Sequence, residues 1–260
     1  MSRALRAEVL KIRTTRLWWG LLIGLAVLVV LNSALIAAFA GADAGPGAPN
    51  LPPLDTPAGF RGALSAGFQS GYLLAAVLGT IIGATDNRHR TATLTFLATP
   101  SRARVVVAKL LAGGAFGAVY ALATQLVSTL VVSIVAALRG SGSQLGDTSV
   151  LRSLVLGVPG IMVWCVIGVS IGILLRNQVA AILVAVGVIY LVDTLLSLGL
   201  HALDVDNVVK FTPNNASTAV VEGFTGYPLL PWWGGVLVLL AYSAVIAFSG
   251  WWLSLRRDIA

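Results

Sequence analysis

Charge is what this sequence has least of. Of its 260 residues, 10% are charged and 57% are hydrophobic, whereas soluble domains usually carry about 25% charged residues. So small a charged fraction cannot cover the surface of a water-soluble particle of this size. The composition therefore excludes a soluble protein and indicates an integral membrane protein.

Groups that carry chemistry are scarce as well. Cys165 is the only cysteine, which excludes an intrachain disulfide and a CxxC zinc site. The two histidines, His89 and His201, fall on opposite membrane sides in the topology derived below. The sequence has no G-x-x-x-x-G-K-[ST] loop, no H-E-x-x-H motif, no paired carboxylates and no nucleophile triad. We therefore expect no enzymatic activity, cofactor or metal in this chain itself.

The sequence is rich in long apolar runs instead. A bilayer core of roughly 30 Å needs about 20 helical residues at about 1.5 Å each. Six runs reach that length, and the first is too long for the core of a cleaved signal peptide. We therefore predict an all-α integral membrane protein with a single transmembrane domain over residues 1–260. Its six transmembrane helices are expected at about 17–40, 62–84, 106–138, 151–175, 179–200 and 232–255.

Lysines and arginines are distributed unevenly between the two sets of loops. Thirteen lie in the N-terminus, residues 85–109, residues 176–178 and the C-terminal tail. Because cationic loops stay on the cytoplasmic side, both termini are predicted to be cytoplasmic. This orientation signal accounts for the net charge of +7, so no nucleic-acid partner is expected. The other set of loops holds four cations: Arg61, Arg139, Arg152 and Lys210.

Two segments outside the spans carry their own patterns. Residues 1–16 are predicted to form an interfacial helix with an apolar stripe at Leu5, Val9 and Ile12 and basic residues mostly elsewhere. A simple membrane anchor would show the same pattern.

Residues 201–231 are predicted to form a long external loop between spans five and six. The loop has apolar patches, and Ser217 is expected to cap a short helix that Gly223 ends. Such a segment enters the outer membrane face only where protein covers its backbone.

The stretch between spans two and three, residues 85–105, is basic and rich in threonine. Its "TATLTFLA" fits a short helix with Leu94 and Leu97 on one side. Thr99 and Pro100 then suit the N-cap and first position of a new helix. Arginines alone would only fix topology and bind lipid phosphates, but a capped helix with exposed leucines on the cytoplasmic surface is a docking element.

These residues resemble a known family. "DNRHRTATLTFLATPSRARVVVAK" looks like the segment between the second and third spans of ABC-2 type transporter permeases. "EVLKIRTTRLWW" is similar to their N-terminal helix, and the six spans and the last external loop, with "FTPNNASTAV", fit the same type V-like fold. The pattern departs at Asp86, where the family usually has Glu, and at Arg90, where it often has Gly.

The resemblance implies a transmembrane subunit of a bacterial ABC exporter in the inner (plasma) membrane. Two copies, or two related chains, would meet side by side, and each would receive a separate ATP-binding subunit that holds ATP and Mg. The short helix would then be the coupling helix seated on that subunit. The residues implied in this contact are Asp86, Arg88, Arg90, Thr91, Leu94, Leu97, Pro100 and Arg102.

Polar residues inside the spans are few. Asp193 lies toward the outer half of span five, and an intramembrane carboxylate indicates a functional site, unless it is close enough to the outer interface to be hydrated. The resemblance places spans two and five around the central path, so Gln69, Asp193 and Thr194 are expected to line it. In span four, Gly168 and Gly172 form a motif for close approach of two helices.

The leading hypothesis is an ATP-driven exporter permease for an amphipathic substrate, such as a drug-like metabolite, a lipid or a peptide. Two other classes stay open. One is an ion-coupled secondary transporter that works through Asp193, although the sequence has no convincing internal repeat and a single buried carboxylate is little machinery for coupling. The other is a membrane immunity or scaffold protein that sequesters a lipid-directed toxin.

Overall fold

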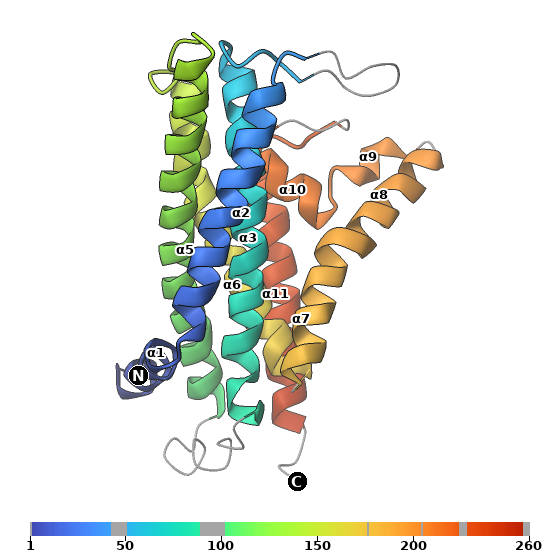
Figure 1. Cartoon of the computed structure of the whole chain (residues 1–260). Coiled ribbons are helices and arrows are strands. Elements are labelled where there is room, and N and C mark those ends of the chain that lie inside the picture. The colour runs from blue at the N-terminus through green and yellow to red at the C-terminus, as the bar shows by residue number, and fades with distance from the viewer. Residues whose placement is uncertain are drawn as a thin grey trace.

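The computed structural model describes residues 2–42, 51–88, 102–175, 177–203, 205–223 and 228–256 (Figure 1). Over these ranges the chain forms helices and connecting loops and contains no strand. Six helical runs are long and apolar enough to cross a membrane. The predicted all-α fold with six such helices is confirmed, and it indicates a multi-pass membrane protein.

The helical runs begin and end close to the predicted positions. The largest difference is in the second span, which begins at Pro57 because the hydroxyl of Thr56 accepts the N–H of Gly59 at 3.1 Å. Threonine before the helix and proline in its first position are a favourable start. The spans are α2 (Leu17–Phe39), α3 (Pro57–Arg88), α5 (Arg102–Leu138), α6 (Thr148–Leu175), the continuous run of α7 (Gln178–Gly187), η1 (Val188–Val192) and α8 (Asp193–Ala202), and α11 (Trp232–Arg256).

Helix α3 is the centre of the bundle. In the most apolar part of each span, 78% of the α3 residues and 56% of the α6 residues are buried, against 22–28% in the other four. The outer helices expose leucine, valine and isoleucine instead, including Leu31, Leu126 and Val245. Apolar surface of this kind is stable in contact with lipid chains, so the outer faces fit a bilayer.

Glycines set the distance between α3 and α6. A Cβ atom at Gly168 would lie 2.1 Å from the carbonyl oxygen of Ala76, and one at Gly172 would lie 2.3 Å from that of Thr80. From the other side, a Cβ at Gly79 would lie 2.1 Å from the carbonyl oxygen of Cys165. The two backbones therefore touch, and the close approach predicted from Gly168 and Gly172 is confirmed.

Helix α1 (Ser2–Thr14) lies across one end of the bundle, beside the first turns of α5 (Figure 1). Leu5, Val9 and Ile12 pack against the hydrophobic core, whereas Arg6 and Arg13 are exposed. The predicted apolar stripe is confirmed. The end of the bundle at which α1 lies, where α3 ends and α5 begins, is called the α1 end below.

The segment between α8 and α11 contains two short helices, α9 (Asp206–Val209) and α10 (Pro213–Val220). Figure 1 shows α8 leaning away from α3 and α11, with α9 and α10 between them. Helix α10 packs on α11 and α6, and its residues from Asn215 to Val220 are buried. Protein therefore covers most of α10, and the end of the bundle that holds it is called the α10 end.

The prediction that Ser217 caps this helix is wrong. The helix begins at Pro213, with Thr212 in the extended conformation before it, because proline pre-sets the first helical φ angle. Ser217 lies inside the helix, and its hydroxyl donates to the carbonyl oxygen of Pro213 at 2.6 Å.

The other end of α10 is closed by two backbone hydrogen bonds, from Gly223 to Thr218 (2.9 Å) and from Glu222 to Ala219 (3.1 Å). They place Glu222, with φ +48°, in the left-handed position that glycine usually takes at a helix end.

Candidate functional site

The predicted coupling residues are placed only in part. Arg90, Thr91, Leu94, Leu97 and Pro100 lie outside the described residues. Of the others, Asp86 and Arg88 belong to the last turn of α3 and Arg102 is the first residue of α5. The segment 85–105 therefore joins two helices at the α1 end of the bundle.

A buried ionic cluster lies beside the two ends of that segment. The ammonium Nζ of Lys109 lies 2.8 Å from Oε2 of Glu8, and the ammonium of Lys11 lies 2.7 Å from Oε1. Lys109 also donates to the backbone carbonyl of Ile82 at 3.3 Å. The side chains of Glu8 and Lys109 are each only 5% exposed. We call this cluster of Glu8, Lys11, Lys109 and the Ile82 carbonyl the α1 joint.

The α1 joint connects three helices. Glu8 comes from α1, Lys109 from α5, and the Ile82 carbonyl from α3. Taking a carboxylate and an ammonium out of water costs several kcal/mol per ion, which only close pairing and further hydrogen bonds offset. The three helices are therefore held in one arrangement, because separating them would leave buried charges unpaired.

The joint is also close to the coupling segment along the chain. Ile82 lies one helical turn before Asp86. Lys109 lies about 10 Å further along α5 than Arg102, at a rise of about 1.5 Å per residue. A displacement of the segment 85–105 would act on α3 and α5 within two turns of the joint.

Neither partner of this ion pair was assigned a contact from the sequence. Lys109 was counted as a topology signal, and Glu8 was given no role of its own. A signal for Glu8 was present, because Leu5, Glu8, Val9 and Ile12 recur at the spacing of one helix face. A carboxylate on the apolar stripe of an otherwise basic helix predicts a cation in the neighbouring element.

A second polar cluster lies at the α10 end, around Asp193. This carboxylate is 3% exposed, and its Oδ1 accepts the backbone N–H of Asn214 at 3.1 Å. Asn214 is the second residue of α10, and the first N–H groups of a helix have no partner within that helix. Asp193 thus caps α10 from another helix, where the positive end of the helix dipole also favours an anion.

The π-helical turn η1 directly precedes Asp193. The N–H of Asp193 bonds to the carbonyl of Val188, five residues earlier. One additional residue in a turn rotates the helix beyond it by about 100° relative to an uninterrupted α-helix. This turn therefore decides which residues of α8 face α10, and π-turns of this kind are frequent at functional sites.

Further hydrogen bonds hold α10 to α3 and α6. The hydroxyl of Tyr72 donates to Oδ1 of Asn214 at 2.5 Å, and Nε1 of Trp164 donates to the hydroxyl of Ser217 at 2.8 Å. The rings of Tyr72 and Trp164 are stacked, with their centroids 5.0 Å apart. Helix α10 is thus held by polar groups as well as by apolar packing.

The predicted path residues are not equivalent. Asp193 is buried against α10, Thr194 is exposed on α8, and Gln69 is half-buried on α3 one turn before Tyr72. Whether any of them lines a path for substrate stays a prediction.

Two substitutions separate a structural from an ion-binding role of Asp193. We expect Asp193→Asn to keep a stable fold, because the amide oxygen can still accept the N–H of Asn214. Asp193→Leu leaves that N–H without its acceptor and should lower the free energy of unfolding by about 1–3 kcal/mol. Thermal unfolding of the purified chain in detergent measures both. Equal stability of the two variants would contradict the capping role.

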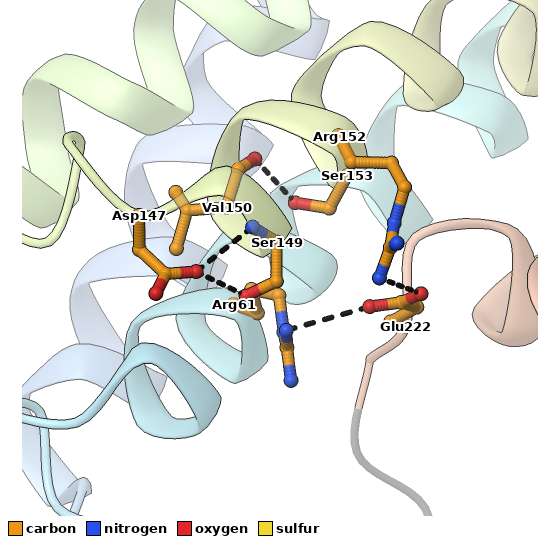
Figure 2. Close-up of polar contacts among 7 residues, drawn as sticks. All are labelled: Arg61, Asp147, Ser149, Val150, Arg152, Ser153 and Glu222. Atoms are coloured by element: carbon orange, nitrogen blue, oxygen red, sulfur yellow. Dashed lines mark hydrogen bonds and ion pairs between the residues drawn. The ribbon is translucent and has the colours of Figure 1, made fainter.

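Two arginines at the α10 end share one carboxylate (Figure 2). Arg152 lies 2.5 Å from Oε1 of Glu222, and Arg61 lies 3.4 Å from Oε2. These contacts fasten the end of α10 to α3 and α6. They also give a reason for a glutamate in the left-handed position, because a glycine at 222 would fit the backbone but would leave both arginines without their carboxylate.

The start of α6 lies beside this arginine pair (Figure 2). Asp147 precedes the helix and accepts the backbone N–H of Ser149 at 2.8 Å and also its hydroxyl. These two hydrogen bonds hold the pKa of Asp147 below its ordinary value. The carboxylate therefore stays ionised at the helix N-terminus, where negative charge is favoured.

Arg139, which follows α5, has a different use. Its guanidinium donates to the carbonyl oxygens of Ala37 and Ala40 at 2.8 and 2.9 Å. These carbonyls end α2, where helix backbone oxygens lack partners and positive charge is favoured.

Comparison with known proteins finds no family model that matches this chain and no curated protein that does.

Proposed function

We propose that this chain is the membrane permease of an ATP-driven transporter of the ABC-2 type and that a separate subunit binds ATP and Mg and hydrolyses the ATP. The α1 joint carries this proposal. The two stretches that resemble ABC-2 permeases, "EVLKIRTTRLWW" and the segment that ends in "VVVAK", contain Glu8 and Lys109. These residues are 101 positions apart and form a buried ion pair.

The joint supports a mechanical role for this end of the bundle. In the proposal, the segment 85–105 docks on the ATP-binding subunit and moves with it. Because α1, α3 and α5 are tied through Glu8 and Lys109, they would move together instead of bending apart. Rigid, packed elements of this kind carry coupling between distant sites.

Helix α3 links the two clusters. Tyr72, which bonds to α10, lies about 24 Å along the helix from Arg88 at 1.5 Å per residue. Movement of the α1 end would therefore reach the α10 end through the most buried helix of the bundle. In this proposal α10 and Asp193 lie where substrate leaves the membrane.

The remaining parts of the proposal rest on composition and on the resemblance to ABC-2 permeases. The chain has few charges, and its outer faces are apolar, which suits export of an amphipathic drug-like metabolite, lipid or peptide and disfavours a highly charged cargo. The cation distribution favours cytoplasmic termini, and the resemblance implies a bacterial cell. A second permease, identical or related, completes the transporter within the lipid of the inner membrane.

Introduction of negative charge into the predicted coupling helix tests the proposal. We expect Leu94→Asp combined with Leu97→Asp to abolish recovery of ATP hydrolysis with the tagged chain, because two carboxylates cannot pack in an apolar groove. The chain is purified from membranes of cells that also express the genes beside its own, and ATPase activity is measured in the eluate.

Leu203→Asp is the control for this experiment, since Leu203 is 73% exposed at the α10 end and should leave ATPase recovery unchanged. The proposal fails when no ATPase accompanies the unaltered chain, or when the double variant retains it.

An ion-coupled transporter is the other candidate, and one observation concerns it. Asp193 is buried inside a span, as a coupling carboxylate would be. However, its contact with Asn214 gives it a structural use that needs no ion. Substrate flux that continues without ATP and is lost in Asp193→Asn, while the fold stays stable, would favour ion coupling.

A further inference from the structure

An open pocket of about 230 Å³ lies at the elbow where α1 is followed by α2. Its wall comes from four helices: the end of α1, the start of α2, the last three turns of α3 and the first residue of α7. It adjoins the α1 joint, because Glu8, Lys11 and Ile82 belong to both.

Polar and apolar side chains both line the pocket. We call the polar ones, including Lys11, Arg16 and Gln178, the rim, and the aliphatic ones, including Leu78 and Ile81, the apolar wall. A site that combines cations with aliphatic side chains is complementary to an amphipathic anion.

The charge of the rim is positive among the described side chains. Glu8 is the one carboxylate in the lining, and its two oxygens already accept Lys109 and Lys11 at 2.8 and 2.7 Å. Lys11 and Arg16 are the two cations of the described lining, against the one carboxylate of Glu8. An entering phosphate would meet a positive field there.

Arg16 is in the best position to hold such a phosphate. It is exposed and immediately precedes α2, whose N-terminus has no side-chain cap. The first amides of a helix and its dipole favour an anion at that point. The guanidinium and the helix start thus attract the same negative group.

The apolar part of the lining includes an exposed side chain at the start of α2. Leu17, in the pocket lining, is 42% exposed, and Trp19, two positions further along α2, is 46% exposed. Tryptophans are enriched at the level of the lipid headgroups. A lipid could therefore place its headgroup in the rim while its acyl chain stays in the bilayer.

We propose that this pocket binds one anionic glycerophospholipid from the leaflet at the α1 end. Its phosphate contacts Arg16 and Lys11, and one acyl chain lies against Leu17, Leu78 and Ile81. A basic pocket between membrane helices is a known setting for anionic lipid headgroups. The inference does not depend on the transport function, because it uses only this pocket and its charges.

A bound lipid would also stabilise the α1 joint. Since Glu8 and Lys11 line the pocket, a lipid that binds only the folded chain raises its stability by mass action. Dioleoylphosphatidylglycerol should therefore raise the unfolding temperature of the chain in neutral detergent more than dioleoylphosphatidylcholine does.

Lipid binding to the full purified chain tests the proposal, measured by native mass spectrometry and by thermal unfolding. We expect Arg16→Gln to weaken phosphatidylglycerol binding about fivefold, the loss of about one cation's contribution at a membrane surface. Arg13→Gln is the matched control, since Arg13 is an exposed cation of α1 outside the pocket lining, and it should leave binding within about twofold. Without lipid, both variants should unfold at the temperature of the unaltered chain, because both arginines are exposed.

Three results would overturn the proposal. Equal binding of phosphatidylglycerol and phosphatidylcholine would show that charge has no part in it. Equal losses in Arg16→Gln and Arg13→Gln would show a diffuse cationic surface instead of a site. Stabilisation by millimolar inorganic phosphate as large as that by phosphatidylglycerol would show an anion site without an acyl chain.

Discussion

Lys109→Met is expected to lower the free energy of unfolding by about 3 kcal/mol, because breaking a buried ion pair leaves a charge without its partner. Glu8 would keep Lys11 but lose the ammonium 2.8 Å from its Oε2, and with it the ion pair between α1 and α5. Reversible unfolding of the purified chain by sodium dodecyl sulfate measures the change.

A double variant separates the ion pair from mere loss of packing. Glu8→Gln together with Lys109→Met should cost less than the sum of the two single changes, because no buried charge is left unmatched. Arg6→Gln, an exposed cation on the same helix, should change stability by no more than about 0.5 kcal/mol. Additive effects of Glu8→Gln and Lys109→Met would rule out direct pairing.

Gly168→Ala is expected to lower the free energy of unfolding by about 3 kcal/mol, at the upper end of the usual cost of overpacking. The added Cβ would lie 2.1 Å from the carbonyl oxygen of Ala76, and backbone on both sides leaves no flexible side chain to move. The α3–α6 contact would have to open, and with it the centre of the bundle. Thermal unfolding in detergent and the yield of monodisperse protein measure the effect.

Gly199→Ala provides a matched control in α8. A Cβ at Gly199 meets nothing within 4 Å, so the same change should be neutral or should add up to about 1 kcal/mol through helix propensity. If both variants unfold alike, α3 and α6 are further apart than their glycines indicate.

Features that show as a helical spacing of residues, or as an apolar run long enough to span a membrane, were predictable from the sequence. The six spans follow from apolar runs, the inner face of α1 from the spacing of Leu5, Val9 and Ile12, and the close approach of α6 to another helix from Gly168 and Gly172, although not that this helix is α3. Each of these depends on residues close together in the chain. The coupling helix was predicted in the same way, but its leucines lie outside the described residues and the prediction is untested.

Contacts between distant residues were not predictable. Nothing in the sequence pairs Glu8 with Lys109, and Asp193 accepts a hydrogen bond from a backbone N–H, a group that every residue but proline carries. The start of α10 was wrongly placed for another reason. Ser217 was preferred as a cap although Thr212 and Pro213, five and four positions earlier, formed the stronger start signal.

Arg139 has a consequence for the way the chain enters the membrane. In the proposed orientation its guanidinium must reach the far side of the bilayer, and its acceptors Ala37 and Ala40 are in place only once α2 and α5 stand together. Arg61 likewise gains its carboxylate partner only after Glu222 has been synthesised, 161 residues later in the chain. During insertion Arg61 and Arg139 are cations on the far side of the membrane, so they oppose the final topology without compensation. The positive charges that precede α2 are synthesised earlier, and they have to set the orientation before Arg61 and Arg139 emerge from the ribosome.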